Sequence, residues 1–330
     1  MAHIIAEAGT NHNGSKQKAK ELIDLASRAK ADSVKFQIIN PWGLYLPGEY
    51  SYGHYDIKKV LKLRESTVLS DDVYRELAMY CNEQGIEFSS SVFDKNGLDL
   101  LCSLDPPYIK IASCDLNNIR FLRQVAETGK KVVLSTGMSS LSDIEKSLKE
   151  IEKSGNLNNF ILLHCVSVYP AKVEQANLSF ITTLKNLFGL EVGFSDHTGD
   201  SLAAVMALAL GATWFEKHFT TDHTQEGLDH AYAMEEDGLT QYVEDIRTAE
   251  IALQPKEDKI SDAERYTRKR ARRSLYAARD LVPGEILKDD DVLCVRPEGI
   301  LDADDIDLVI GKSVQTPIRQ YEAFTFEKIG

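Results

Sequence analysis

Residues 1–254 repeat one pattern eight times, a short apolar segment followed by an amphipathic one. Runs of the first kind are typical of buried strands, and apolar side chains three or four residues apart are typical of helices. The expected strands cover residues 4–9, 33–37, 87–92, 108–113, 131–137, 160–166, 193–198 and 214–220. The expected helices cover residues 16–30, 71–84, 96–103, 118–128, 142–153, 179–187, 201–210 and 236–253. Because parallel strands that are apolar throughout need both faces covered, this alternation predicts an α/β protein with a (β/α)₈ barrel. A doubly wound open sheet is the alternative.

The character of the chain changes after Gln254. Residues 255–273 are highly charged and resemble a linker, whereas residues 274–330 resemble short strands separated by turns. The expected strands of this part cover residues 275–278, 292–295 and 308–311, and a Pro-Gly pair at 283–284 marks a turn. We therefore expect a barrel domain over residues 1–254 and a small β-rich domain over residues 274–330.

The balance of charges limits the partners that this chain can bind. Of the 330 residues, 38 are Lys or Arg and 51 are Asp or Glu, which gives a formal net charge of −13. A protein that binds nucleic acid needs a basic face, so nucleic acid is not expected as a partner. The basic run at residues 268–273 is the exception, and in a chain this acidic we interpret it as part of a solvated linker.

The cysteines and the apolar runs of the sequence indicate the cellular compartment of the protein. The five cysteines are an odd number without a CxxC pair, which favours reduced thiols in a cytoplasm over a disulfide framework. A strand-like run begins directly after Met1, without the basic region and long apolar stretch of a signal peptide. No run approaches ~18 consecutive apolar residues, so no membrane span is expected. These features predict a cytoplasmic protein.

One connection is much longer than the others. Residues 38–70 lack clear periodicity and carry several aromatic side chains, namely Trp42, Tyr45, Tyr50, Tyr52 and Tyr55. Long loops inside compact domains are usually functional or disordered, and the aromatic side chains favour an ordered flap. We expect the choice of substrate to depend on this flap, around residues 40–42.

Polar side chains follow most of the expected strands, at the end where a barrel of this kind carries its active site. They are Glu7, Lys35, Gln37, Ser91, Lys110, Ser113, Asp115, Ser135, Ser167, Tyr169, Ser195, His197, His218 and Asp229. Two lysines with several serines can bind an anion, because ammonium groups supply charge and hydroxyl groups donate to phosphate or carboxylate oxygens. Helix N-termini on the same side add partial positive charge.

Two histidines end neighbouring strands. His197 and His218 could share one divalent metal, because neutral imidazole is a common ligand. The alternatives are two unrelated polar strand ends or a hydrogen-bonded core histidine. A phosphate-bearing anion beside a metal that polarises a carbonyl suits carbon–carbon bond formation or phosphoryl chemistry.

Short motifs follow one another along the chain. They are residues 6–14 (AEAGTNHNG), 34–37 (VKFQ), 110–113 (KIAS), 134–138 (LSTGM), 164–165 (HC), 169–170 (YP), 193–198 (GFSDHT) and 216–220 (EKHFT). In these motifs the chain resembles the sialic acid synthase family, the nonulosonate synthases that condense phosphoenolpyruvate with an N-acetylated hexose. The tail resembles the antifreeze-like (SAF) domain of that family through residues 273–276 (RSLY) and 295–297 (VRP).

The resemblance implies a role for each group of residues. His197 and His218 would hold a divalent metal, typically Mn²⁺ with Mg²⁺ or Co²⁺ as alternatives, that orients and polarises the sugar aldehyde. The residues that would bind phosphoenolpyruvate are Lys35, Ser91, Lys110, Ser113, Ser135, Ser167 and Ser195. The residues that would contact the sugar are Gln37, Tyr169 and Asp229. Glu7 would help orient water or the aldehyde, and Asp115 would be a second acid or base beside the phosphate.

The resemblance also implies a homodimer. The small domain of one chain would cover the barrel of its partner, and Arg296 would reach the neighbour's sugar. Three positions depart from the pattern of the family, which often has Thr in place of Ser91, Asn in place of Ser167 and Glu in place of Asp115. Ser167 is shorter than Asn, which leaves its contact with phosphate open.

Several alternatives remain at this point. Another phosphoenolpyruvate-dependent synthase of a shorter keto sugar acid is disfavoured by the small tail domain. A non-catalytic sugar-acid binding protein is disfavoured because both histidines, both lysines and Glu7 are present together. Ice binding by the tail has only fold analogy behind it. The acceptor is equally open, since N-acetylmannosamine, a diacetamido trideoxyhexose and a phosphorylated form all suit these motifs.

Overall fold

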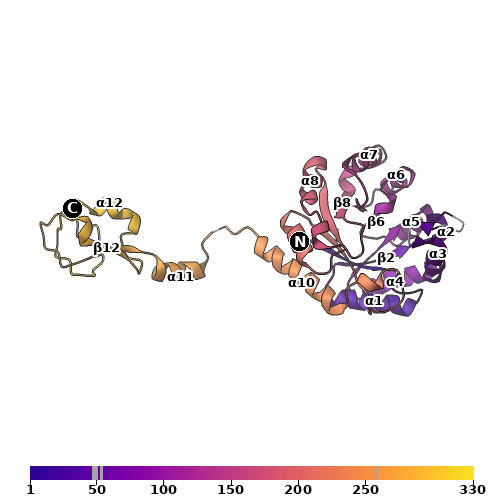
Figure 1. Ribbon diagram of the computed structural model, residues 1–330, viewed down its shortest axis with the longest axis horizontal. Helices are drawn as coiled ribbons and strands as arrows, with labels where there is room; N and C mark the ends of the chain where they lie inside the picture. The colour runs from indigo at the N-terminus through magenta and orange to yellow at the C-terminus, as the bar shows by residue number, and fades with distance from the viewer. Residues whose placement is uncertain (47–50, 53–54, 258) are drawn as a thin grey trace. The chain divides into compact units, whose positions relative to one another are not determined.

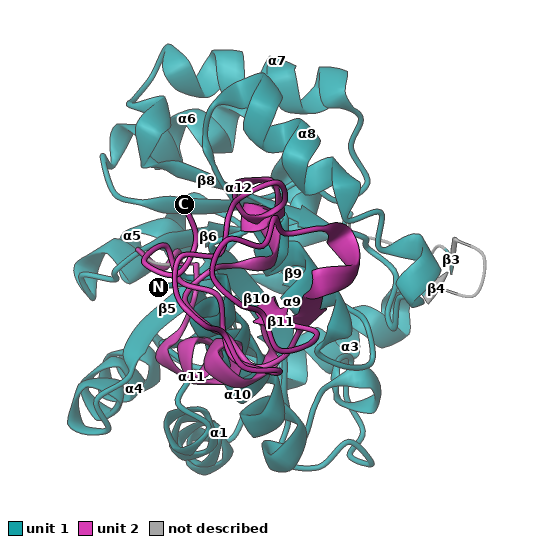
Figure 2. Ribbon diagram, turned by 90° about the vertical axis from the view of Figure 1, so that its left-hand side faces the viewer, with its two compact units in different colours: residues 1–254 teal, residues 255–330 magenta. Residues whose placement is uncertain are grey.

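The computed structural model describes residues 1–46, 51–52, 55–257 and 259–330. The chain forms two compact units, Met1–Gln254 and Pro255–Gly330 (Figure 2). No helix in the described ranges is both long and apolar enough to cross a bilayer. All five cysteines are unpaired.

Eight parallel strands of the first unit close into a barrel (Figure 1), which confirms the predicted (β/α)₈ architecture and shows that the open-sheet alternative is wrong. The order around the barrel is β1-β10-β9-β8-β7-β6-β5-β2. The strands are β1 (His3–Gly9), β2 (Ser33–Ile38), β5 (Glu87–Val92), β6 (Ile109–Ile111), β7 (Val132–Ser135), β8 (Phe160–Cys165), β9 (Glu191–Asp196) and β10 (Trp214–His218).

Helices form the outer layer of this unit (Figure 1). They are α1 (Lys16–Arg28), α4 (Asp71–Glu83), α5 (Lys95–Ser103), α6 (Ile119–Glu127), α7 (Leu141–Glu152), α8 (Ser179–Phe188), α9 (Leu202–Ala209) and α10 (Glu236–Leu253). Their apolar faces bury against the strands, and several begin at a side-chain cap. Ser140, for example, forms a reciprocal capping box with Asp143, which satisfies free N–H groups at the start of α7.

The inside of the barrel is apolar toward the amino ends of the strands. Every second strand residue points inward, and Ile5, Tyr108, Val133, Ile161, Leu163 and Trp214 pack there as one buried cluster. The His3 ring stacks on Trp214 with a centroid distance of 4.1 Å, and the Ser33 and Tyr108 hydroxyl groups lie 2.8 Å apart. This packing fills the lower barrel, so a ligand can enter only from the carboxyl ends of the strands.

The long connection after β2 is more regular than expected. It contains α2 (Pro41–Leu44), a small pair of strands, β3 (Ser51–Tyr52) and β4 (Tyr55–Asp56), and helix α3 (Ile57–Ser66). The Asp56 side chain caps α3, and Ile57, Val60 and Leu61 are buried. Part of the predicted flap, residues 47–50 and 53–54, lies outside the described residues, so the prediction of an ordered flap stays a prediction.

The second unit has its own core around a two-stranded antiparallel sheet, β11 (Ser274–Ala277) and β12 (Val292–Val295). Its buried residues are Leu275, Ala277, Leu281, Leu287, Leu301, Val309, Val314, Ile318, Phe324 and Ile329. The predicted strand at 308–311 is wrong, because α12 (Ile306–Val309) occupies that position. Ile306 and Val309 face the core three residues apart, which is helical spacing, and Leu308 is 49% exposed.

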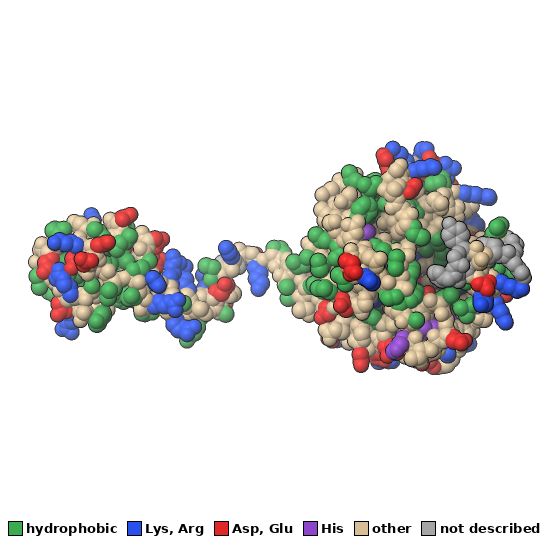
Figure 3. Space-filling model, viewed as in Figure 1, with side chains coloured by type: hydrophobic (Ala, Val, Ile, Leu, Met, Phe, Trp, Pro, Cys, Tyr) green, Lys and Arg blue, Asp and Glu red, His purple; other side chains and the backbone are tan. Residues whose placement is uncertain are grey.

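Half of the segment expected to be a linker is helical. Helix α11 (Asp262–Ala271) begins at a capping box between Ser261 and Glu264 and buries none of its residues. Lys and Arg side chains gather over it (Figure 3). Arg268 pairs with Glu298 at 2.5 Å and with Asp302 at 3.8 Å, so the basic run is neutralised in part by acids of its own unit.

Short 3₁₀ turns complete the chain at Ser113–Asp115, Leu157–Asn159, Val173–Gln175, His230–Tyr232, Asp289–Asp291 and Ala303–Asp305. Two of them, Ser113–Asp115 and His230–Tyr232, follow strands β6 and β10 along the chain. They therefore belong to the end of the barrel where ligands enter.

The buried interior cluster should contribute to the stability of the barrel. We expect Leu163→Ala to lower the free energy of unfolding by about 2–5 kcal/mol, because it leaves a cavity among packed side chains. Leu187→Ala is the control, since Leu187 is 60% exposed, and it should change stability by less than about 0.5 kcal/mol. Urea titration followed by circular dichroism measures both, and equal losses would contradict the packing described.

Candidate active site

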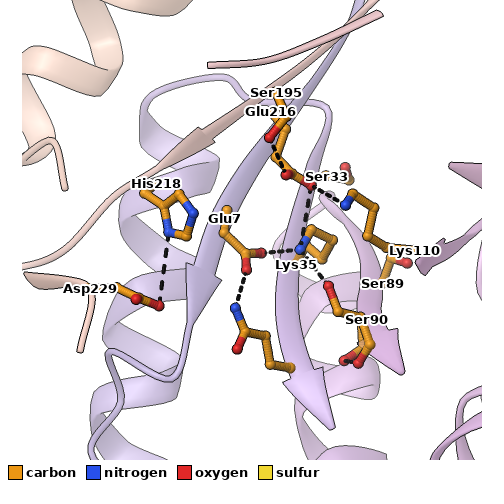
Figure 4. A network of polar contacts seen from close by, with 12 residues as sticks. Glu7, Ser33, Lys35, Ser89, Ser90, Lys110, Ser195, Glu216, His218 and Asp229 are labelled. Atoms are coloured by element: carbon orange, nitrogen blue, oxygen red, sulfur yellow. Dashed lines mark hydrogen bonds and ion pairs between the residues drawn. The ribbon is translucent and has the colours of Figure 1, made fainter. Parts of the chain in front are cut away.

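Charged and hydroxyl side chains form a network of polar contacts inside the barrel (Figure 4). Glu7 on β1, Lys35 on β2, Lys110 on β6, Ser195 on β9 and Glu216 on β10 are all buried. The alternation of strand side chains places them inside the barrel, one or two inward positions above the apolar cluster. The structure thus brings together the two lysines that the sequence analysis assigned to anion binding.

The two lysines share carboxylate partners. Lys35 Nζ forms an ion pair with Glu7 Oε2 and lies 3.4 Å from Glu216 Oε2, while Lys110 Nζ lies 3.7 Å from the same Glu216 oxygen. Each lysine also donates to a serine hydroxyl, Lys35 to Ser91 at 2.9 Å and Lys110 to Ser135 at 2.8 Å. The predicted serines Ser91 and Ser135 are therefore in direct contact with the lysines.

Glu216 and Glu7 have different electrostatic surroundings. Burial raises the pKa of Glu7 to about 7, with Lys35 opposing that shift. Burial acts in the same direction on Glu216, but Lys110 and Lys35 together lower its pKa. Glu216 is therefore the permanent anion of the pair, and Glu7 is the group that can exchange a proton near neutral pH. Two carboxyl groups whose pKa values are driven apart are the usual arrangement of an acid–base site.

A second group of hydroxyls lies around Gly137, just after β7. The Gly137 N–H donates to Ser113 Oγ at 3.0 Å. A Cβ atom at Gly137 would lie 2.4 Å from Ser167 Oγ, 2.7 Å from Cys165 Sγ and 2.9 Å from Ser113 Oγ. The close approach requires glycine, and the hydroxyls of Ser113 and Ser167 both lie beside it. Because the Gly137 N–H already donates to Ser113, the two hydroxyls are the groups that could donate to an oxyanion here.

The two predicted histidines are neighbours, with ring centroids 5.6 Å apart. His197 Nδ1 donates to the Val166 carbonyl at 2.7 Å, so its Nε2 carries the lone pair, with Ser195 Oγ 3.4 Å away. His218 Nδ1 is buried without a hydrogen-bond partner among the described residues, and the nearest Asp229 oxygen is 4.0 Å away. Burial lowers the pKa of His197 to about 4 and also lowers that of His218.

Two neutral imidazoles, one with an unsatisfied buried nitrogen, fit a divalent metal. The described part of the chain contains no group of three or more His, Cys, Asp or Glu side chains placed to hold such an ion. His197 and His218 are the two side chains that could hold it here, and a metal with two protein ligands keeps open positions for water or substrate.

The predicted sugar contacts lie beside these groups. Gln37 Nε2 donates to Glu7 Oε1 at 2.7 Å, and the Tyr169 ring packs on His197 at a centroid distance of 4.1 Å. Asp229 accepts a hydrogen bond from the Tyr232 hydroxyl at 2.6 Å. Tyr169 is 47% exposed, so its ring can contact a ligand that reaches the histidines.

Two predicted site residues are not joined to this cluster by the contacts of the described chain. Asp115 is buried, but its hydrogen bonds are local, from Asn118 at 3.0 Å and from the Cys114 thiol at 3.7 Å. Arg296 follows β12 in the second unit and is exposed there. Their proposed roles therefore rest on the resemblance alone.

Sequence reasoning missed two residues of the site, Glu216 and Tyr232. Glu216 could have been found, because it stands two residues before His218 on one strand and so must point the same way. Tyr232 lies 5.3 Å from His218 and 5.1 Å from Tyr169 between ring centroids. It lies in a turn after β10, and no motif or strand end in the sequence marked it as a site residue.

The remaining histidines near this end of the barrel have structural partners. His230 bonds to Thr220 Oγ1 at 2.7 Å and to Asn13 Oδ1 at 3.3 Å, and His164 Nε2 bonds to the Ala176 carbonyl at 2.7 Å. His12 Nδ1 accepts from the Gly14 N–H at 3.1 Å. The contacts of His164 and His230 fit structural roles, whereas His12 Nε2 is buried without a hydrogen-bond partner among the described residues.

Comparison with known families gives matches over both units. A model described as the NeuB family matches residues 22–258, and a model described as the SAF domain matches residues 272–329. N,N'-diacetyllegionaminic acid synthase of Legionella pneumophila is 35% identical over 340 residues, which span 99% of this chain and 94% of that protein. Human N-acetylneuraminate-9-phosphate synthase is 33% identical over 99% of this chain and 92% of its own length.

A solved structure gives the same picture. The crystal structure of N-acetylneuraminic acid (sialic acid) synthetase from Leptospira borgpetersenii serovar Hardjo-bovis, in complex with citrate, superposes with a TM-score of 0.72. It is 34% identical, and the match covers 81% of this chain and 90% of that one. The likeness therefore extends to sequence as well as to fold.

Burial of the neutral His12 ring should make stability depend on pH. Burial lowers its pKa to about 4, against about 6.5 in an unfolded chain. Between these values the unfolded chain binds a proton that the folded chain does not. The free energy of unfolding is therefore highest, as far as His12 is concerned, above about pH 6.5. It falls by up to about 3 kcal/mol as the pH drops to about 4. Urea titrations across this range should show a shallower pH dependence for His12→Gln than for the wild type; equal slopes would refute the assignment.

Proposed function

This chain belongs to the NeuB family, and on that premise we propose that it is a nonulosonic acid synthase, which condenses phosphoenolpyruvate with an N-acetylated hexose and releases phosphate. The observation that carries the proposal is one barrel mouth that holds two buried lysines, a group of serines and two neutral histidines. The lysines and serines suit the anionic substrate, and the histidines suit a metal that acts on the other substrate.

Binding of phosphoenolpyruvate is assigned to the lysine and serine groups. Lys35 and Lys110 would neutralise the carboxylate and the phosphate. The hydroxyls that would donate to their oxygens are those of Ser91, Ser113, Ser135, Ser167 and Ser195. Support for Ser167 comes from its approach to Gly137, beside which the Ser113 hydroxyl also lies. In the proposal, the short Ser167 side chain therefore suffices for an oxyanion contact.

A divalent metal, with Mn²⁺ as the first candidate, would be held by His197 and His218. When bound, it would act as a Lewis acid on the aldehyde carbonyl of the acceptor. The hydrogen bond from His197 Nδ1 to Val166 fixes which nitrogen faces the site. Gln37, Tyr169 and Asp229 would orient the sugar so that its aldehyde carbon meets the bound phosphoenolpyruvate.

The reaction we propose forms one carbon–carbon bond and breaks one carbon–oxygen bond. The methylene carbon of phosphoenolpyruvate attacks the aldehyde carbon, water adds to the carbon that bears the phosphate, and phosphate departs with its bridging oxygen. Water must lose a proton and the aldehyde oxygen must gain one. Glu7, whose pKa lies near 7 and which contacts Lys35, is the group we assign to that transfer.

The acceptor class is proposed from the relatives, which are named for different products, a diacetylated legionaminic acid and a 9-phosphate of N-acetylneuraminic acid. For either kind of product, the acceptor that we propose is an N-acetylated hexose. We also propose a homodimer in which Arg296, exposed after β12, contacts the sugar in the partner's barrel.

Phosphate release tests the activity. Purified protein should release inorganic phosphate from phosphoenolpyruvate only when both Mn²⁺ and a suitable N-acetylated hexose are present, and excess chelator should abolish release. The panel comprises N-acetylmannosamine, its 6-phosphate and a diacetamido trideoxyhexose. Release without any sugar, or none with any sugar from folded protein, would count against the synthase.

The glycine between the two serines offers a separate test of the phosphate site. Gly137→Ala should reduce kcat/KM for phosphoenolpyruvate by about 100-fold, because its methyl group occupies the place where Ser113, Ser167 and Cys165 converge. Gly238→Ala is the matched control, since a methyl group there meets only ordinary contacts with Met234. Normal kinetics in the Gly137 variant would exclude this point as the phosphate site.

A further inference from the structure

A buried ion pair lies next to the two histidines, and the proposed reaction gives it no role. Asp196 and Lys217 directly precede His197 and His218 in the sequence, and Lys217 Nζ lies 3.3 Å from Asp196 Oδ2. Strand side chains alternate between the two faces of a sheet, so Lys217 points away from the interior that His218 faces. Its ammonium lies 5.3 Å from the centre of the Tyr242 ring on α10. The pair therefore lies in the layer between the barrel and its helices, where its side chains are no more than 3% exposed.

This ion pair also holds the backbone that follows His197. Asp196 Oδ1 accepts hydrogen bonds from the Thr198 N–H at 2.8 Å and from the Thr198 hydroxyl at 2.7 Å. The Lys217 ammonium donates to the Thr198 carbonyl. The two peptide groups that flank Thr198 are thus bonded to the ion pair, one to each member. The course of the chain after His197 is therefore fixed relative to β10, the strand that carries Lys217.

The hydrogen bonds between the strands do not extend this far. The register of β10 on β9 ends with Lys217 opposite Asp196. His218 is still paired, but with β1 on its other side, and His197 follows the last residue of β9. The ion pair is thus the last pair of this ladder, and through Thr198 it continues the connection between the two strands past His197.

Stability alone is a weak reason for a charged pair at this position. Two buried charges lose their hydration, and their mutual attraction often does no more than offset that loss. The other buried residues of α10 are the apolar Leu239, Val243 and Ile246, so apolar side chains suit this layer. Apolar side chains could not bond to the peptide groups that flank Thr198, and buried peptide groups need such partners. The chemistry of the pair therefore fits a role in fixing the backbone.

We propose that Asp196 and Lys217 are positioning residues that set the spacing of His197 and His218 for a divalent metal. The Nδ1 atom and the backbone carbonyl of His197 are bonded to the segment after β8, so these two contacts do not set its distance from His218. The inference rests on the metal site of the proposed synthase and adds to it two residues that do not touch the metal. Removing groups that orient metal ligands costs about 10- to 100-fold in metal affinity or activity.

The test measures binding without turnover. Calorimetry gives the dissociation constant for Mn²⁺ and, in a separate titration with chelator present, that for phosphoenolpyruvate. The variant combines Asp196→Asn with Lys217→Met, which removes both charges together so that neither is left buried without its partner. The matched control combines Asp32→Asn with Arg247→Met. That pair also joins a strand to α10, with Arg247 Nη2 2.6 Å from Asp32 Oδ2, but it lies just before the start of β2, at the amino ends of the strands.

The double variant of Asp196 and Lys217 should bind Mn²⁺ about 10- to 100-fold more weakly than the wild type, because the two histidines are no longer held at one separation. Its dissociation constant for phosphoenolpyruvate should change by less than about twofold, since the substitutions do not touch the lysine and serine groups. Asp196→Asn alone keeps the size of the side chain and should weaken Mn²⁺ binding in the same direction. The control pair should bind both ligands as the wild type does.

Three results would overturn the inference. Unchanged Mn²⁺ affinity in both variants would leave the ion pair with a role in packing alone. Equal losses of Mn²⁺ and phosphoenolpyruvate binding would show a general disturbance of the barrel mouth. Wild-type protein that binds no Mn²⁺ would refute the metal site and this inference with it. Failure of the synthase proposal is a different result, in which wild-type protein binds Mn²⁺ but releases no phosphate with any acceptor; the Mn²⁺ titrations still decide the role of the ion pair.

Discussion

Two ammonium groups buried inside a barrel are the constraint on which the rest of the site depends. Removing Lys35 and Lys110 from water is costly unless oppositely charged groups and hydrogen-bond acceptors accompany them. Glu216 lies near both, Glu7 pairs with Lys35, and Ser91 and Ser135 each accept one hydrogen bond from a lysine. Burial raises the pKa of Glu7 to about 7 against the opposing effect of Lys35, so the two carboxyl groups do not have equal electrostatic surroundings.

The barrel stabilises this arrangement because its interior is divided into an apolar part and a charged part. Trp214, Glu216 and His218 are successive inward residues of β10, and they belong in turn to the apolar cluster, the lysine network and the histidine pair. Packing below holds the strands in register, so charged groups above it are positioned by the same backbone. Ser195 on β9 and His197 just after it therefore lie close together, with Oγ and Nε2 3.4 Å apart.

Sequence patterns predicted the barrel because each strand and each helix has a local signal. The strands are short apolar runs, and the helices have apolar residues at helical spacing. Sequence patterns also predicted that Lys35, Lys110, His197 and His218 would meet, since strand ends of a barrel share one rim. Local sequence patterns failed to predict elements whose burial depends on contacts with distant parts of the chain. Helix α3 buries only three side chains, and α12 was mistaken for a strand because a four-residue apolar run carries no periodicity of its own.

Residue types and their order were thus enough to determine the fold class, the rim where chemistry would occur and the acidic character of the whole chain. Only the tertiary structure decided which groups share a proton or a charge. Glu216 became the common partner of two lysines, and Gly137 the position beside which two serine hydroxyls lie. These properties depend on distances of a few ångströms between residues far apart in the chain, and such distances are set by how strands close and helices pack.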